Sequence, residues 1–473
     1  MDHILYWNAV ALETNRHDFT EIPMGAVKPL PEQGGPTLSS RALAIVHLAM
    51  YDAHAAVVGG VNLPRYLPAP LAPAGITASD AVAGAAYATL SALFPRQQSR
   101  FDTAAGGLVP GANAGFDFGI AVGNAMLANR AGDPGAGYAG YLPSTARFHH
   151  RPDPVTAQTG FHAPFYGKNS KCFAVSRRHD LDDPRRDAAQ YVRAVKQVRG
   201  KGIAPELMGT LPAAYEKRTA EQTLIGLFWA YDGPRGLGTP PRFYNLIVRQ
   251  VADERGNTPD QNACLFAFVN AAMGDAGILA WEQKYKWDLW RPVLGIREGD
   301  PSMGPSPAPA AGFDGDCDPD WRPLGAPASN GSGSDFTPPF PAYPSGHATF
   351  GAAAFHITRL FYGVALGDRN KDTITTRPVV SEELNGATRD SKGAIRPMHT
   401  RTFKGGLWQM IEENGFSRVY LGVHWFLDAF ALKMNEDEPD YNQKCIGGVN
   451  LGLAIAEDIW TVGNKKAPKK STA

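Results

Sequence analysis

The sequence predicts an all-α protein of two helix bundles, of the four-helix-bundle type, joined by long ordered loops. Apolar residues recur at helical spacing in many segments, and no alternating run longer than four residues suggests a strand. Gly (51) and Pro (38) are abundant between these segments. Because 473 residues exceed one typical domain, we expect an N-terminal bundle over 1–215 and a C-terminal bundle over 216–473.

Capping residues mark helices in the N-terminal half. Ser39 and Ser40 precede the apolar run RALAIVHLAMYDAHAAV and are favourable N-caps, so a helix is expected to begin there. Ser79 and Asp80 open a second helix, which Pro95 closes. Amphipathic periodicity predicts further helices over 114–130 and 186–200.

The C-terminal half continues this pattern before and after a long loop. Helices are expected over 217–232, 241–254, 260–287, 347–362, 404–414 and about 416–434. Two segments rich in Gly and Pro, 132–170 and 299–346, are longer than ordinary connections, and ordered loops of that length are usually functional. The second leads into PAYPSGHATF (341–350).

Composition excludes several classes of function. Lys+Arg and Asp+Glu are both 46, so no global basic field attracts nucleic acid. Four scattered cysteines without CxxC spacing argue against a zinc site or a disulfide framework. The N-terminus MDHILYW lacks the positive charge of a signal peptide, and no run of 18 apolar residues occurs. We therefore expect a soluble protein without a membrane partner, either cytoplasmic or non-classically secreted.

The segment Pro344-Ser345-Gly346-His347 stands at the start of a predicted helix. Helix N-termini expose unpaired N–H groups and the positive end of the macrodipole, which makes them anion sites. Gly346 lets the backbone approach a ligand closely. The segment therefore predicts an anion site with a hydroxyl, a backbone N–H and an imidazole.

Two further segments supply cations and a second histidine. Lys284 and Arg291 are seven residues apart, which places both on one helical face, and the following proline, Pro292, is expected to end that helix. His424 and Asp428 are four residues apart and are expected to be neighbours on another helix.

Arg418 adds a third cation six residues before that histidine. Arginine offers forked contacts to several oxygens, and lysine offers a point charge. Together with the serine, glycine and histidines, the three cations form a set suited to a tetrahedral or trigonal-bipyramidal oxyanion.

The three segments match K-x6-R-P, P-S-G-H and S-R-x5-H-x3-D, complete and in order. They resemble the signatures of the superfamily that joins vanadium-dependent haloperoxidases with type 2 phosphatidic-acid phosphatases and bacterial acid phosphatases. Most of the chain also resembles the fungal vanadium chloroperoxidase branch, in segments such as YWNAVALETNR, HAPFYGK, WAYDG, GTPPRFYN and PPFPAYPSGHATFG. The region 95–160 and the C-terminal tail are shorter than in that branch.

The resemblance implies a vanadate cofactor and a set of residues that hold it: Lys284, Arg291, Ser345, Gly346, His347, Arg418 and His424. It implies that His424 bonds the vanadium and that Asp428 orients its ring. A histidine in an apolar helix is otherwise more often a core residue, and Asp428 a surface acid.

The resemblance also implies an acid–base role for His347, which faces the apical oxygen ligand. Asp232 of WAYDG would hydrogen-bond this imidazole and raise its pKa, unless it belongs to a plain Asp-Gly turn. Lys284 would polarise a peroxide oxygen. Trp281 and Phe340 would line the halide side of the pocket, or else be core aromatics.

The implied activity is oxidation of chloride or bromide by hydrogen peroxide to hypohalous acid, on vanadate bonded to His424. A small organic acceptor and a monomeric or homodimeric state complete the expectation. The alternative is a phosphohydrolase, in which His424 forms a phosphohistidine and His347 protonates the leaving group. A non-catalytic anion-binding protein would not need two histidines beside the anion.

Overall fold

The computed structural model describes residues 2–20, 30–68, 71–156, 160–305, 316–331, 333–372, 374, 376–434 and 436–473, and structural statements below concern these residues. The helices of the first half are α1 (His3–Asp18), α2 (Gly35–Val58), α3 (Ala78–Leu93), α4 (Gln98–Ala104), α5 (Ala114–Asn129), α6 (Tyr166–Asn169), α7 (Ala188–Lys201) and α8 (Ala220–Phe228). Those of the second half are α9 (Pro240–Glu254), α10 (Pro259–Trp287), α11 (Pro292–Arg297), α12 (Gly346–Phe361), α13 (Gly406–Tyr420), α14 (Phe426–Ala429) and α15 (Gly448–Val462).

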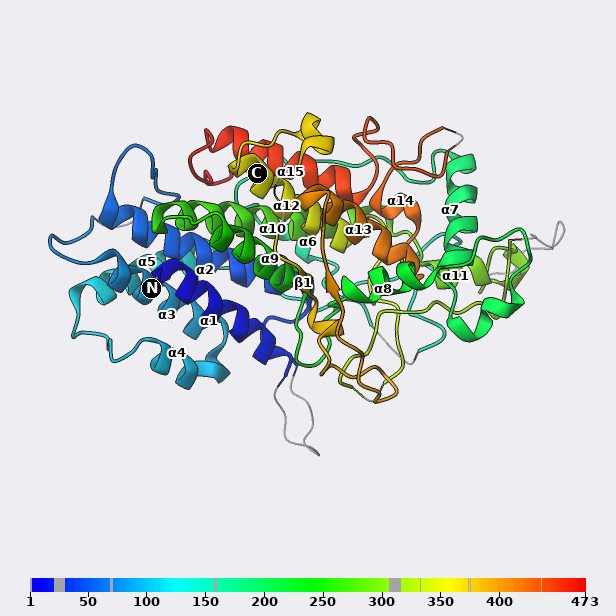
Figure 1. Cartoon of the computed structure of the whole chain (residues 1–473), viewed down its shortest axis with the longest axis horizontal. Helices are drawn as coiled ribbons and strands as arrows, with labels where there is room; N and C mark the ends of the chain where they lie inside the picture. Colours follow the sequence, from blue (N-terminus) through cyan, green and yellow to red (C-terminus); the bar gives the residue numbers. More distant parts are fainter. Residues whose placement is uncertain are drawn as a thin grey trace.

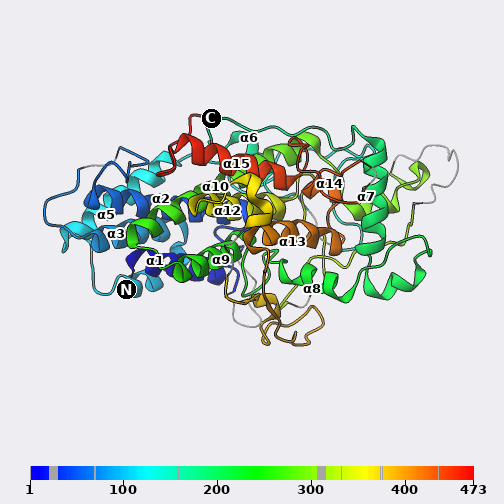
Figure 2. The ribbon, with the colours of Figure 1, turned by 45° about the horizontal axis from the view of Figure 1, so that its top comes forward.

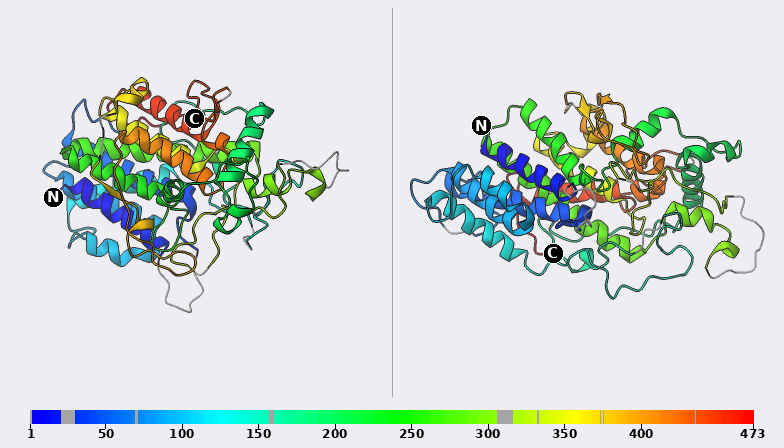
Figure 3. Two further views of the ribbon diagram at one scale, coloured as in Figure 1. Left: turned by 45° about the vertical axis from the view of Figure 1, so that its right-hand side comes forward. Right: turned by 90° about the horizontal axis from the view of Figure 1, so that it is seen from below.

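The strands of this described part are one short antiparallel pair, β1 (Val379–Val380) and β2 (Thr400–Arg401). The all-α class is therefore confirmed. In Figure 1, α1 to α5 (blue and cyan) lie at the lower left, and α12 to α15 (yellow to red) lie above them and extend to the right. Figure 3 shows the two groups of helices from two further sides.

The long helix α10 connects the two sides. A capping box between Thr258 and Gln261 and a proline in its first turn begin it. It packs against α2 on one side and against α12 and α15 on the other, and Figure 2 shows α10 and α12 side by side. The buried apolar side chains form one main cluster that runs from α1 to α15, so both halves share a core through α10. The four-helix-bundle detail stays a prediction.

The helix expected to begin after Ser39 and Ser40 begins earlier. Gly34 is the N-cap of α2, with a proline in the first turn, and both serines lie buried inside the helix. Their hydroxyls donate to the carbonyls of Gln33 and Thr37. A serine inside a helix can direct its hydroxyl to a backbone carbonyl in this way. Neither serine stands at the start of α2, so neither caps it.

Lys284 and Arg291 do not share a helix, and this expectation was wrong. α10 ends at Trp287 because Asp288 adopts a left-handed conformation with φ 48°. Arg291 is the N-cap of α11, and Pro292 begins that helix instead of ending the previous one.

The helix expected over 416–434 is also interrupted. α13 ends at Tyr420, and Gly422 has φ 72° in the turn that follows. A Cβ at this glycine would lie 2.3 Å from the Gly202 carbonyl oxygen, so only glycine fits the turn. His424 therefore stands in a turn, and Asp428 lies in the short helix α14.

Other helices agree with the sequence to within a few residues, including α3, α5, α7, α9, α10 and α12. The helix expected over 217–232 ends early, at Phe228, where α8 ends. α1, α4 and α15 were not predicted. Part of the long loop 299–346, namely 306–315, lies outside the described residues.

Two helices, α2 and α10, are long and apolar enough to cross a bilayer. Their most apolar 18-residue windows are 78% and 100% buried inside the fold, as expected of core helices. The burial agrees with the role of α10 as the element shared by both halves.

Candidate active site

The N-terminus of α12 is the centre of the candidate site. Ser345 is the N-cap, and its hydroxyl accepts a hydrogen bond from the Ala348 N–H at 3.4 Å. A Cβ on Gly346 would lie 3.3 Å from the Trp281 ring, which is closer than ordinary contact. The glycine therefore lets the helix end and the indole pack together, as the sequence suggested.

His424 reaches this helix end from the turn before α14. Its Nδ1 lies 2.7 Å from Asp428 Oδ2, and its Nε2 lies 2.9 Å from Nη1 of Arg291. A guanidinium can only donate, so Nε2 carries the lone pair and Nδ1–H donates to the carboxylate. Burial and the nearby cations hold the pKa of His424 well below its usual value, which keeps the ring neutral. Its Nε2 is therefore chemically suited to bond a metal.

Asp428 fixes this arrangement. Its Oδ2 also accepts the Trp425 N–H at 2.9 Å, and its backbone carbonyl accepts the Ser345 N–H at 2.7 Å. The predicted contact between His424 and Asp428 is confirmed, although a helix cap and not a long helix creates it. The hydrogen bond from the Ser345 N–H to the Asp428 carbonyl directly joins two of the three sequence motifs.

The three cations are buried, with exposed fractions of 0% for Lys284, 0% for Arg291 and 1% for Arg418. The Lys284 ammonium donates to the carbonyls of Pro341 (2.9 Å) and Ala342 (3.0 Å) and also to that of Pro344.

The two arginines are held differently. Arg291 donates from Nε to the Phe340 carbonyl at 2.9 Å and from Nη1 to the Val423 carbonyl at 2.7 Å. Arg418 forms a two-point ion pair with Asp232, at 2.8 and 2.9 Å.

This charge distribution favours an anionic ligand. Lys284 and Arg291 form no ion pair with a carboxylate in the part of the chain that the structure describes. Burial lowers the pKa of Lys284 well below its usual value and that of Arg291 to about 9. Arg291 Nη2 and Arg418 Nε are buried without a hydrogen-bond partner among the described residues. A buried cation without a counter-ion is costly, so these residues fit an oxyanion such as vanadate.

His347 lies at the wall of the site with 8% of its surface exposed. Its Nε2 lies within hydrogen-bond distance of the Ala230 carbonyl, so this nitrogen carries the proton and Nδ1 keeps the lone pair. Burial, assisted by Arg418, lowers the pKa of His347 to about 3, although Asp232 and the carbonyl act in the opposite direction. The imidazole is therefore neutral and keeps a lone pair at Nδ1, and the negative charge of a bound oxyanion would raise its pKa towards the value that a proton acceptor needs.

The expected hydrogen bond between Asp232 and His347 was wrong. Both oxygens of this carboxylate bind Arg418, and the Ala230 carbonyl takes the imidazole N–H in its place. The charge of Asp232 does act to raise the pKa of His347, as expected, but desolvation by burial outweighs it and the net pKa is lowered.

Trp281 and Phe340 form an aromatic wall beside the cations. Their ring centroids are 4.8 Å apart. The Phe340 centroid lies 5.1 Å from Lys284 Nζ and 4.9 Å from Arg291 Cζ, which are cation–π distances. Trp281 and Phe340 therefore lie together beside the cations, as the sequence suggested.

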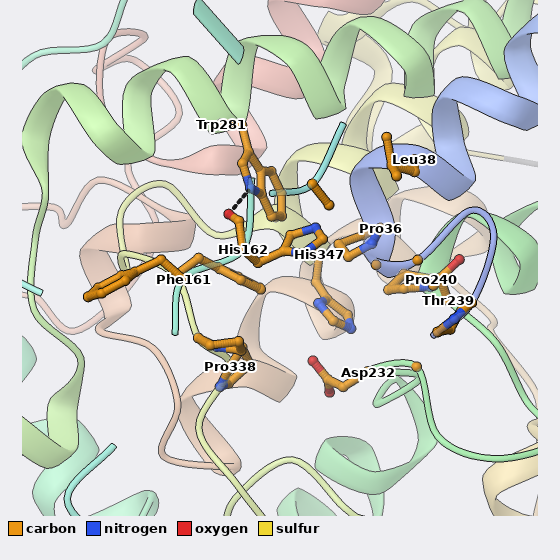
Figure 4. A pocket seen from close by; sticks show the side chains of 18 of the residues that line it. Pro36, Leu38, Phe161, His162, Asp232, Thr239, Pro240, Trp281, Pro338 and His347 are labelled. Carbon is orange, nitrogen blue, oxygen red and sulfur yellow. Dashed lines mark hydrogen bonds between the residues drawn. The ribbon is translucent and has the colours of Figure 1, made fainter. Parts of the chain in front are cut away.

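His162 extends this wall and was missed as a site residue, although it lies in the HAPFYGK segment. Its carbonyl accepts the Trp281 indole N–H at 3.2 Å, the dashed line of Figure 4. Its N–H donates to the Pro339 carbonyl at 2.9 Å. Only the tertiary fold brings this residue, 119 positions away, onto the indole.

A cavity of about 580 Å³ opens onto the site. It is lined by the site residues Asp232, Trp281, Phe340, Gly346, His347, Arg418 and His424. Figure 4 shows Asp232 and His347 beside Trp281, His162 and Pro338. Lys284, Arg291, Ser345 and Asp428 are not part of its lining.

Comparisons with known proteins point to one family along most of the chain. A family model described as the vanadium chloroperoxidase N-terminal domain matches residues 1–172, and one described as the VCPO second helical-bundle domain matches residues 264–431. The expected boundary at 215/216 falls between them and stays a prediction. Vanadium chloroperoxidase of Curvularia inaequalis is 34% identical over 99% of this chain and 91% of that protein.

Solved structures share the fold at lower identity. A bacterial vanadium-dependent iodoperoxidase gives a TM-score of 0.61 at 17% identity, over 99% of this chain and 98% of that one. An apo-type bacterial vanadium-dependent chloroperoxidase gives 0.60 at 16% identity, over 92% and 95%. With its two matched domains and its fungal relative, the chain belongs to the vanadium chloroperoxidase family, whose cofactor is vanadate.

Proposed function

We propose that the N-terminus of α12 and the surrounding cations hold the vanadate of this vanadium haloperoxidase, and that chloride as well as bromide is oxidised there by hydrogen peroxide. The carrying observation is the orientation of the His424 ring among buried cations: Asp428 pairs its Nδ1–H, and Nε2 presents its lone pair to Arg291, whose N–H a ligand of Nε2 would take over. When bound, vanadate supplies Lewis-acid activation of hydrogen peroxide without changing its own oxidation state.

The residues of the chain supply the remaining functions. His424 contributes the metal-ligating nitrogen, and Asp428 keeps its Nδ1–H paired. Arg291 and Arg418 offer unused N–H groups to anionic oxygens, with the Ser345 hydroxyl and the Gly346 N–H at the helix end. Because all these groups are fixed before substrate arrives, they stabilise developing charge without reorganisation.

His347 and Lys284 act on the peroxide. His347 accepts its proton at Nδ1, since Nε2 already donates to the Ala230 carbonyl. The Lys284 ammonium donates to a peroxide oxygen and makes it more electrophilic, which requires exchanging one of its three carbonyl contacts.

Chloride is supported as a substrate by the aromatic wall of Trp281 and Phe340. This wall excludes water from the side of the cations, and a dry site strengthens their effect on the reacting atoms. The Curvularia relative carries chloroperoxidase in its name. A monomeric or homodimeric state, without nucleic-acid or membrane partners, also stays a prediction.

The test is halogenation of monochlorodimedone by hydrogen peroxide, with and without orthovanadate, in chloride and in bromide. We expect vanadate-dependent turnover with both halides, abolished in His424→Ala and retained in His399→Ala, a change at an exposed histidine outside the site. Turnover with bromide alone would overturn the chloride proposal. Vanadate-inhibited hydrolysis of p-nitrophenyl phosphate without halogenation would favour the phosphohydrolase.

A further inference from the structure

The cavity above the candidate site is far larger than the inorganic substrates need. Its volume is about 580 Å³, whereas a water molecule, comparable in size to peroxide or a halide ion, occupies about 30 Å³ in the liquid. Cavities of about 300–1,000 Å³ are typical of sites for small organic ligands. The spare volume therefore matches an organic molecule.

The walls of the cavity are mainly aromatic and apolar. Away from the oxyanion site they include Phe19, Leu38, Tyr138, Phe161, Phe336 and Pro338. These side chains offer an anion no compensation for its lost hydration, so a halide gains nothing there. Aromatic edges and faces favour contact with another aromatic ring.

His162 supplies a polar group within this apolar region. Its Nε2 lies 2.9 Å from the Thr37 hydroxyl, while its Nδ1 has no hydrogen-bond partner among the described residues. The ring lines the cavity, with its centroid 5.9 Å from that of Trp281. Burial lowers the pKa of His162 to about 4, so the ring is neutral at physiological pH. A neutral imidazole nitrogen can hydrogen-bond a hydroxyl group.

We propose that this cavity binds a phenolic aromatic acceptor, with its ring among the aromatic walls and its hydroxyl on His162 Nδ1, and that the halogen is transferred to it inside the cavity. The inference rests on the proposed haloperoxidase function. It makes His162 a positioning residue.

The transfer balances without a further reagent. Halide, hydrogen peroxide and one proton give hypohalous acid and water, so the halide is oxidised by two electrons and the peroxide is reduced. The phenol ring then loses its proton and forms a carbon–halogen bond, while the hypohalite oxygen leaves as a second water. Because His162 holds the hydroxyl of the phenol, its distance from the reacting halogen decides which ring carbon reacts.

The experiment uses the vanadate-loaded full chain and 1-naphthol, which has two reactive positions, 2 and 4. We expect saturable 1:1 binding by calorimetry and a ratio of 2-bromo to 4-bromo product that differs about threefold or more from that of added hypobromous acid, since about 0.7 kcal/mol of positioning suffices. 1-Methylnaphthalene, which has a methyl group in place of the hydroxyl and cannot hydrogen-bond His162, should bind about five- to tenfold more weakly, as expected for one lost hydrogen bond.

Leu38→Trp fills the cavity from α2, at a distance from the oxyanion groups. It should weaken naphthol binding about tenfold or more by steric exclusion and return the product ratio to that of hypobromous acid. Bromide-dependent peroxide consumption without naphthol should stay within about twofold, because no oxyanion contact changes. Leu71→Trp, at a leucine that is 90% exposed, is the matched control and should behave as wild type.

Each outcome is decisive for one claim. If wild type oxidises bromide but binds no naphthol and gives the product ratio of hypobromous acid, the acceptor site is refuted and free hypohalite is the product. If naphthol binds but bromide causes no peroxide consumption, the proposed haloperoxidase function fails instead. The wild-type isotherm and product ratio decide the matter even if Leu38→Trp does not fold.

Discussion

Arg418 and Asp232 form a two-point ion pair at the wall of the cavity, and this pair occupies the carboxylate that the sequence assigned to His347. The side chains are 1% and 6% exposed. Asp232 thereby holds one cation of the site in place while leaving its Nε unpaired. The pair positions Arg418 for an anion without neutralising Lys284 or Arg291.

Asp232→Asn should destabilise the protein. Removing one partner of a buried ion pair leaves the other charge uncompensated and costs about 3 kcal/mol or more. Urea unfolding of the metal-free protein measures this loss. Asp253→Asn breaks the exposed pair with Arg377, in which both side chains are over 60% exposed, and should cost less than about 1 kcal/mol. Equal effects of the two changes would show that the Arg418 pair is not buried in solution.

Asp428→Asn should weaken vanadate binding. The amide cannot accept the His424 Nδ1–H with the strength of a carboxylate, so Nε2 loses basicity and orientation. The vanadate concentration that gives half-maximal bromide oxidation should rise about 10- to 100-fold, as for other partners of metal-bound histidines. Unchanged vanadate dependence would contradict the role assigned to Asp428.

Phe340→Ala should lower turnover with chloride more than turnover with bromide. Loss of the ring opens the side of Lys284 and Arg291 to water, which weakens their effect on the reacting atoms. Chloride is the harder halide to oxidise, so its turnover should fall about tenfold or more while that of bromide falls less. Rates with each halide at saturating vanadate provide the measurement, and a parallel fall of both would argue against a halide-specific wall.

His47 gives a pH dependence of stability unrelated to catalysis. The ring is 2% exposed, its Nδ1 bonds the Leu43 carbonyl at 2.7 Å, and its Nε2 bonds the Asn8 amide at 2.9 Å. Burial lowers the pKa of His47 to about 4, from 6.5 in the unfolded chain. The unfolded state therefore binds the proton more tightly between these values.

Stability from His47 is fully present above pH 6.5 and is lost as the pH falls towards 4, by about 3 kcal/mol in total. His47→Gln cannot titrate, so its unfolding free energy should lose less than that of wild type over this interval. Denaturant titrations at pH 7, 5.5 and 4.5 measure the difference. Parallel curves for the two proteins would show that His47 does not stay neutral in the folded state.

The sequence was informative where motifs carry chemistry locally. Ser345 and Gly346 stand at a helix start as predicted, because a cap residue, a small residue and an apolar run are all visible within ten positions. The spacing of His424 and Asp428 correctly gave their contact. The helix assumed for it was wrong, because the left-handed turn at Gly422 depends on the backbone of Gly202, which is distant in sequence.

Tertiary relationships explain the other differences. α10 ends after Trp287 because Asp288 adopts a left-handed conformation. An aspartate in the sequence does not by itself predict the end of a helix. The partner of Asp232 was wrong because Arg418, 186 positions away, competes for the same carboxylate. His162 was missed because only folding brings it onto Trp281.

The most direct test of the central claim is titration of the metal-free protein with orthovanadate, followed by ⁵¹V nuclear magnetic resonance, for wild type and His424→Ala. We expect one vanadate per chain in wild type and a loss of affinity of about 100-fold or more in the variant, since the bond to Nε2 disappears while the cations remain. Equal affinity and an unchanged signal in His424→Ala would contradict the assignment of His424 as the vanadium ligand.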